Sequence, residues 1–267
     1  MSDTPGSLRR HAALAACLVC TLAGRAAAQA PEPAPVEFLP RIEFHLAANT
    51  LWLPAEDQRF SWDAYFGGDV DFLDYRVGRL SGLAEYHVVL GDEYRPFDPN
   101  QSYYTLEVSS SYRIGGTEIA ANFHHVSRHL SDRPKQLAIA WNVAGARVLR
   151  RFTGKGVTVD LRAGGGAIVE HAYVDYRFAA DGEVMLRRPI NPRLGWFVHF
   201  TGELFTVDGT VPDRGTQTGE RVEVGLRING RAGSLELFAG GERRLDADPI
   251  DRETRSWGLA GFRLLNR

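Results

Sequence analysis

Residues 103–114 read Tyr-Tyr-Thr-Leu-Glu-Val-Ser-Ser-Ser-Tyr-Arg-Ile. Most side chains at alternate positions are apolar, and those between them are polar or charged. Successive side chains of an extended strand point to opposite faces, so this period of two predicts a strand with one apolar and one polar face. The alternation recurs in residues 157–162 and 221–228, and helical periodicity is hard to find after residue 36. The sequence therefore predicts an all-β protein.

Twelve strands are expected along the chain, and the second is long enough to be broken at Gly67-Gly68. They lie near 40–50, 58–76, 79–90, 101–114, 117–128, 136–150, 156–170, 174–187, 193–206, 219–229, 234–244 and 254–265. Tight turns such as Gly115-Gly116 alternate with longer polar loops such as 91–100 and 207–218. This alternation is typical of bacterial outer-membrane barrels. We expect a single antiparallel transmembrane β-barrel of about 12 strands over residues 40–267, with a secreted β-sandwich as the alternative.

Composition excludes several classes of protein. The 267 residues carry 31 Lys and Arg against 33 Asp and Glu, a balance that disfavours a nucleic-acid partner. A hydrophobic content of 44% with 24% charged residues excludes a disordered chain. The predicted polar faces carry charges of both signs, which suits a crowded, narrow lumen. The run Gly164-Gly165-Gly166 is interpreted as a bend or a close backbone approach in a barrel.

The first 30 residues have the layout of a secretory signal peptide. Leu8-Arg9-Arg10-His11 is basic, Ala12 to Gly24 is apolar, and Ala28-Gln29-Ala30 is a small-x-small cleavage pattern. Residues 31–39 are expected to be a leader before the barrel. A barrel behind a signal peptide predicts location in the cell outer membrane, with its lipids as partners.

Both cysteines of the chain lie inside this segment. Cys17 and Cys20 would leave with the signal peptide, so the mature chain would hold no thiol. Leu14-Ala15-Ala16-Cys17 also resembles a lipoprotein cleavage box, which leaves lipidation at Cys17 as the alternative.

One segment has the residue types of a reactive site. Residues 123–132 read Phe-His-His-Val-Ser-Arg-His-Leu-Ser-Asp. His125 and Ser127 are two positions apart, so on a strand they share a face, which is one way to place a Ser nucleophile beside its base. A polar rim bonded to loops and headgroups is the alternative, and a metal site using His125 and His129 is another. His124 is expected to face the lumen, in a satisfied polar network.

Two resemblances are carried by this segment. His125, Ser127, His129, Leu130 and Asp132 match the pattern His-x-Ser-Ser-His-Leu-Gly-Asp-Glu of an uncharacterised family of bacterial outer-membrane barrels. That resemblance implies a barrel and no established activity.

The segment is also similar to the active site of outer-membrane phospholipase A, a twelve-stranded family with a His-x-Ser-Asn-Gly motif. The resemblance implies that Ser127 is the nucleophile, His125 the base and Asn142, preceded by Trp141, the residue that orients the imidazole. Arg128 and His129 replace the Asn-Gly of the motif, which puts the family's Ca²⁺ and oxyanion arrangement in question.

The alternation on the sixth strand argues against this triad. Leu137, Ile139, Trp141 and Val143 form its apolar set, which we expect to face lipid. Asn142 would then point into the lumen, away from His125, unless a β-bulge reversed it.

Three function classes stay open. The first and favoured one is a structural or envelope-interacting barrel of unresolved role. The second is a lipid hydrolase without a cofactor, or with Ca²⁺, and the third is a narrow solute pore. The sequence leaves open whether the chain is an enzyme, and a homodimer is not excluded.

Overall fold

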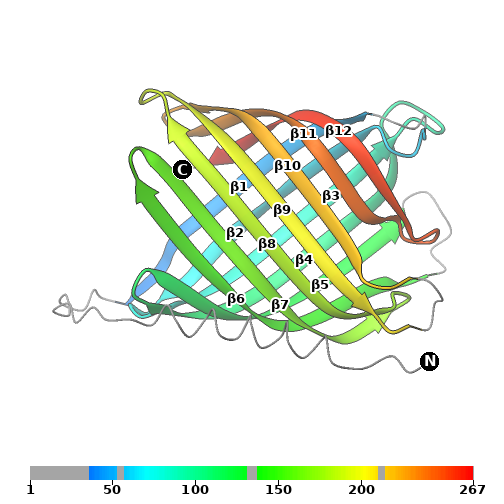
Figure 1. Cartoon of the computed structure of the whole chain (residues 1–267), viewed down its shortest axis with the longest axis horizontal. Helices are drawn as coiled ribbons and strands as arrows, with labels where there is room; N and C mark the ends of the chain where they lie inside the picture. Colours follow the sequence, from blue (N-terminus) through cyan, green and yellow to red (C-terminus); the bar gives the residue numbers. More distant parts are fainter. Residues whose placement is uncertain (1–35, 53–56, 131–136, 210–213, 267) are drawn as a thin grey trace, which may run out of the picture. The chain divides into compact units, whose positions relative to one another are not determined.

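The chain forms a closed barrel of twelve antiparallel strands (Figure 1). The computed structural model describes residues 36–52, 57–130, 137–209 and 214–266. The strands are β1 (Glu37–Trp52), β2 (Trp62–Asp74), β3 (Arg79–Gly91), β4 (Asp98–Ile114), β5 (Thr117–Leu130), β6 (Ile139–Gly154), β7 (Val157–Ala172), β8 (Tyr176–Pro189), β9 (Leu194–Val207), β10 (Gln217–Asn229), β11 (Gly233–Asp248) and β12 (Glu253–Asn266). This confirms the predicted all-β barrel and its strand number.

The ring closes where the first strand pairs with the last. The register of β1 on β12 runs from His45 opposite Leu265 to Trp52 opposite Gly258. β2 is continuous, so the expected break at Gly67-Gly68 was wrong. A Cβ on Gly67 would lie 2.6 Å from the backbone oxygen of Ala84, so this glycine admits a close neighbour strand.

Glycines serve the same purpose between β6 and β7. A Cβ on Gly145 would lie 2.4 Å from the oxygen of Gly165, and a Cβ on Gly166 would lie 2.4 Å from the oxygen of Ala144. The predicted close approach at the Gly164–Gly166 run is therefore present. No helix in the described residues is long and apolar enough to cross a membrane.

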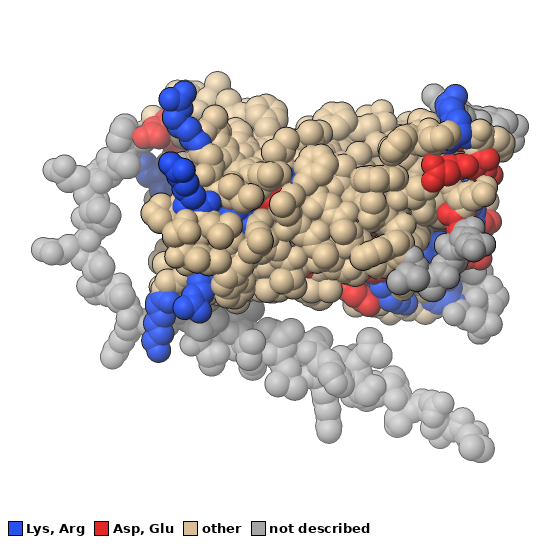
Figure 2. Space-filling model, turned by 90° about the horizontal axis from the view of Figure 1, so that it is seen from above, with Lys and Arg blue, Asp and Glu red and all other residues tan. Residues whose placement is uncertain are grey.

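On the face seen in Figure 2, a largely uncharged band lies between charged ends of the barrel. Large apolar side chains are exposed on the outward face of the strands along this band. They include Phe44, Phe66, Leu106, Val108, Phe123, Val148, Leu161, Val184, Phe200, Val224, Leu226 and Leu237. Water would disfavour such a continuous apolar surface, whereas the hydrocarbon of a bilayer accepts it. The structure is that of a transmembrane barrel, and the polar faces line its interior. The predicted signal peptide and Cys17 lie outside the described residues, as do residues 31–35 of the expected leader. Residues 37–39 belong to β1 instead, so the first strand starts earlier than expected.

The lumen is cross-braced by ion pairs. Arg244 on β11 bonds Asp63 on β2, with a shortest nitrogen–oxygen distance of 2.5 Å. Arg221 on β10 donates a hydrogen bond of 3.0 Å to Asn49 on β1. Arg147 on β6 pairs with Glu107 on β4 at 2.7 Å. On most strands an inward charged side chain meets a partner of opposite sign, so both signs occur on the polar faces.

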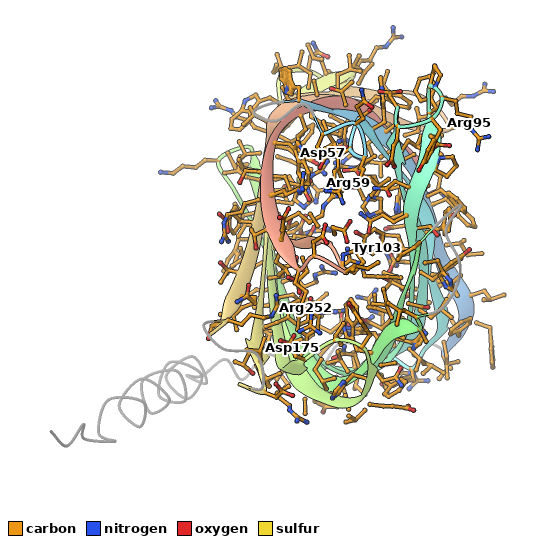
Figure 3. The ribbon with its side chains drawn as sticks, turned by 90° about the vertical axis from the view of Figure 1, so that its right-hand side faces the viewer. Asp57, Arg59, Arg95, Tyr103, Asp175 and Arg252 are labelled. Carbon is orange, nitrogen blue, oxygen red and sulfur yellow. The ribbon has the colours of Figure 1, made fainter. Side chains whose placement is uncertain are left out.

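The loop end of the barrel is closed by the end of β11. Its register shifts between Arg244 and Asp248, and Leu245, Asp246 and Ala247 are buried. Arg214 holds Asp246 through an Nη1–Oδ1 bond of 2.9 Å. Figure 3 looks into the barrel from this end, with Asp57 and Arg59 on one side of the opening and Asp175 and Arg252 on the other. We call residues 245–248 the cap.

The acidic residues of the cap are not in a solvated loop. Asp246 and Asp248 are buried, and Arg59 bonds Asp248 at 2.7 Å. Because arginines neutralise both carboxylates, this cluster is part of the barrel's ionic interior.

Replacing Arg244 with Ala should destabilise the barrel. Asp63 is fully buried and would lose its guanidinium partner, a loss that typically costs about 3–5 kcal/mol. Urea unfolding in lipid vesicles measures the effect. Arg243→Ala, on the same strand with a half-exposed side chain, is the matched control and should change stability by less than about 1 kcal/mol. Equal stability of the two variants would contradict this account of the lumen.

Candidate functional site

The structure joins His125 and Asn142 across two neighbouring strands. They are direct partners in the β5–β6 register, so their side chains share the outward face. The Nδ1 atom of His125 lies 2.7 Å from the Oδ1 atom of Asn142. An amide oxygen only accepts, so Nδ1 carries the proton and Nε2 is left with a free lone pair. That tautomer is the one a general base requires.

The expectation that Asn142 points into the lumen was wrong, and no bulge in β6 is needed to correct it. Ile139, Trp141 and Val143 are buried rather than exposed to lipid. Trp141 and Val143 pack with Tyr176, Phe205 and Leu245 beneath the cap. The apolar set of this strand end therefore faces the interior, and Asn142 between them faces outward.

Ser127 lies on the same outward face of β5 as His125. Its Oγ atom is 3.0 Å from Nε2 of His129, two residues further along the strand. Ser127 is thus flanked on its own strand by two imidazoles. In this arrangement the hydroxyl is bonded to His129, while the imidazole oriented by Asn142 belongs to His125.

A row of aromatic rings leads across the outer surface to this point. The ring centroids of Phe66 and Tyr86 are 5.0 Å apart, those of Tyr86 and Tyr104 4.7 Å, and those of Tyr104 and His129 5.2 Å. Tyr104 is the cross-strand neighbour of Ser127. Aromatic belts mark the boundary between hydrocarbon and headgroups, so we expect the site to lie near that boundary.

The adjoining residues of the motif take other places. His124 lines the lumen, 3.8 Å from a carboxylate oxygen of Glu107, as expected for a lumen network. Arg128 is buried and bonds the backbone oxygen of Asp246 at 2.8 Å. It therefore has no access to an ester at Ser127. Asp132, which completed the family pattern, lies outside the described residues.

One residue of the site was missed from sequence. Glu170, near the end of β7, accepts a hydrogen bond of 2.8 Å from Nδ2 of Asn142. The available signal was a carboxylate that directly follows the apolar run Ala167-Ile168-Val169 near a strand end. Charged side chains are unfavourable on a lipid-facing strand, least so near the interface.

The described residues around Ser127 do not fit a Ca²⁺ site. That ion prefers six to eight oxygen ligands with several carboxylates. Glu170 is the carboxylate at the site, and it is engaged with Asn142. No group of three or more His, Cys, Asp or Glu suited to a metal occurs in the described part of the chain. The alternative of a His125–His129 metal site gains no support either, because no third ligand residue joins the two histidines among the described residues.

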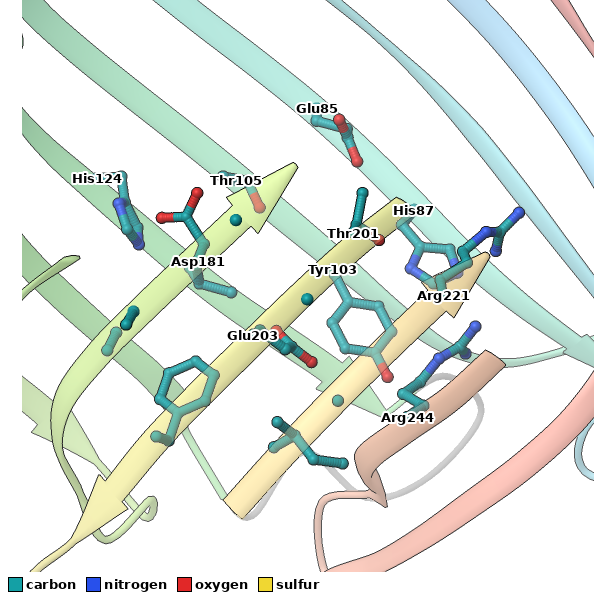
Figure 4. Close-up of a pocket in the computed structure, with 18 of the residues that line it drawn as sticks. Glu85, His87, Tyr103, Thr105, His124, Asp181, Thr201, Glu203, Arg221 and Arg244 are labelled. Atoms are coloured by element: carbon teal, nitrogen blue, oxygen red, sulfur yellow. The ribbon is translucent and has the colours of Figure 1, made fainter. Parts of the chain in front are cut away.

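The lumen contains cavities that stop at the cap. One of about 970 Å³ lies towards the turn end, and one of about 480 Å³ lies beneath the cap (Figure 4). Tyr65, Glu85 and Arg221 line both. At the loop end Gln101 bonds the backbone oxygen of Ala247 at 2.7 Å, beside Arg128. The interior is thus hollow but crossed by bonds between opposite walls.

Comparison with known proteins shows the fold and leaves the role unresolved. No family model matches the chain, and no curated protein matches it. Outer membrane phospholipase A from Escherichia coli is similar in structure, with a TM-score of 0.50 and 12% identity over 86% of this chain and 98% of that one. The phospholipase of Salmonella typhi, described as a dimer with bound calcium, gives a TM-score of 0.50 and 12% identity over 90% and 94% of the two chains.

A third similar structure is LpxR from Salmonella typhimurium, with a TM-score of 0.47 and 11% identity over 84% of this chain and 99% of that one. The closed barrel and its apolar exterior, with a fold like that of the Escherichia coli phospholipase, place the chain in the cell outer membrane.

We expect the purified barrel to be electrically silent. Arg128 bonds the cap backbone inside the loop end, and we expect these contacts to block ion flow through the lumen. Planar-bilayer recording is the measurement, with the protein added to one side. Stable ohmic steps from the wild-type protein would instead favour the solute-pore alternative.

Proposed function

We propose that this barrel hydrolyses an acyl ester of an outer-membrane lipid, with Ser127 as nucleophile. The observation that carries the proposal is the 2.7 Å bond that fixes His125 in the base tautomer, two residues from Ser127 on the same lipid-facing surface. A structural barrel needs no such arrangement. The polar-rim alternative explains a histidine on the surface, but gives no reason for its fixed tautomer.

The residues can perform the reaction in two halves. A rotation about χ1 of Ser127 moves Oγ from His129 towards Nε2 of His125, which takes the hydroxyl proton as Oγ bonds to the ester carbonyl carbon. The imidazolium then gives that proton to the leaving alcohol as the carbon–oxygen ester bond breaks. Water then bonds to the acyl carbon as the same imidazole takes its proton. The bond from that carbon to Oγ breaks, the fatty acid leaves, and the imidazolium returns the proton to Oγ of Ser127. Asn142 holds the imidazole of His125 in the same orientation and tautomer throughout the reaction.

The position of the site defines the substrate class. Ser127 faces outward at the level of the aromatic row, and the acyl chains of a lipid would lie along the apolar band beneath it. Lipid therefore reaches the hydroxyl from the membrane plane, without passing through the lumen. Esters of fatty acids in phospholipids or glycolipids share the required chemistry.

We extend the proposal to Ca²⁺ and to a homodimer. The Salmonella typhi phospholipase, whose fold this chain resembles, is a dimer with bound calcium. The described residues do not themselves supply a calcium site, so we derive no step through the ion. Chemical cross-linking in membranes tests whether two copies associate.

Ser127→Ala should abolish lipid hydrolysis by the purified barrel. His125→Ala should lower the rate by about 100-fold or more, since general-base catalysis typically contributes that much. Release of fatty acid from mixed vesicles of phospholipid and lipopolysaccharide is measured with Ca²⁺ and with EDTA. Ser110→Ala, an outward serine of β4 at the other end of the barrel, is the control and should match wild type. Equal activity of Ser127→Ala and wild type would end the nucleophile assignment and leave the structural role.

A further inference from the structure

Glu170 lies behind the proposed triad, at its far end from Ser127. Its Oε2 atom accepts the 2.8 Å bond from Nδ2 of Asn142, whose Oδ1 in turn accepts from His125. The side chain is exposed on the outward surface of β7.

A β-bulge turns Glu170 towards this position. In the β6–β7 register Asn142 is opposite Glu170, but Val143 is opposite Ile168, which leaves Val169 as an extra residue. Ile168 packs against the interior cluster beneath the cap, and Val169 is 58% exposed. Strict alternation would have sent Glu170 into the lumen. Bulges are frequent beside active sites because they redirect a side chain in this way.

The carboxylate determines how the Asn142 amide is oriented. An amide has a donor side and an acceptor side, and either could face His125. A carboxylate only accepts, so Glu170 binds the NH₂ group and leaves Oδ1 for the imidazole. Without that restraint, the amide could turn its NH₂ group to His125 and favour the tautomer that carries its proton on Nε2. That tautomer has no free lone pair facing Ser127.

We propose that Glu170 is a positioning residue that completes a four-membered chain from Ser127 through His125 and Asn142. This inference rests on the hydrolase function proposed above. Glu170 selects the amide orientation, and thereby the base tautomer of His125. Its negative charge also stabilises the imidazolium that forms when Ser127 loses its proton.

Two variants separate the hydrogen bond from the charge. Glu170→Ala removes both, and Glu170→Gln retains an oxygen acceptor without the charge. Glu220→Gln, on β10 across the barrel and half-exposed, is the matched charge control. Folding of every variant is checked by the heat-dependent shift of the folded barrel on gels.

The first readout is the tautomer of His125, measured by ¹⁵N NMR of histidine-labelled barrel in detergent micelles. We expect proton occupancy on Nδ1 in wild type and in Glu220→Gln, and a mixture of Nδ1 and Nε2 forms in Glu170→Ala. An unchanged tautomer in a folded Glu170→Ala variant overturns the inference. This measurement needs no activity, so it holds whether or not the hydrolase proposal succeeds.

The second readout is the split between kcat and KM on vesicles. Because Glu170 acts through Asn142 and does not touch the ester, kcat should fall by about 10- to 100-fold in Glu170→Ala with KM unchanged, the usual loss for a supporting residue. Glu170→Gln should fall between Glu170→Ala and wild type. Wild-type kcat in Glu170→Ala, with Ser127→Ala inactive, overturns the role of Glu170 alone. Full activity in Ser127→Ala overturns the hydrolase proposal itself.

Discussion

Backbone hydrogen bonding in lipid is the constraint on which the whole structure depends. Hydrocarbon offers no partner for an N–H or C=O group, so every strand needs two neighbours and the sheet must close. Here closure is achieved by β1 and β12, whose register is continuous over eight residue pairs. Once the ring is closed, alternate side chains of each strand point outward to lipid, because successive side chains lie on opposite faces of a sheet. The others must then satisfy their charges with one another across the lumen.

The cap introduces an exception to that alternation. At the loop end, Leu245 and its neighbours provide an apolar interior inside the mouth of the barrel. Trp141 and Val143 bury themselves there rather than in lipid. The apolar face of a strand thus changes from lipid-facing to interior-facing where the cap begins. Because Trp141 and Val143 face the interior, Asn142 between them faces outward. The β5–β6 register, which has no shift, then places Asn142 opposite His125.

The sequence was sufficient for the barrel because alternation and loop lengths are local signals that repeat twelve times. It also placed His125 and Ser127 on one face of one strand, where the structure has them. It failed for Asn142, because an apolar side chain near a barrel mouth packs equally well against lipid or against a cap. For Glu170 the sequence offered only a carboxylate after an apolar run, which does not fix the direction of its side chain. Its direction depends on a single extra residue, Val169, that no turn or glycine signal marks.

Rigid strands and a shallow depth explain how a polar constellation can face a membrane. The three contributing strands β5, β6 and β7 are paired to one another along their length, so the His125–Asn142–Glu170 bonds are set by backbone register rather than by loops. Sites built on such elements hold their geometry more closely than sites on loops. All three side chains lie within a few residues of the loop end, where headgroups and water still solvate charge. A few residues deeper, the same carboxylate would meet hydrocarbon. A few residues further out, Ser127 would lose contact with the ester bonds of the lipid. The constellation therefore occupies the narrow zone in which a lipid ester and a solvated base can meet.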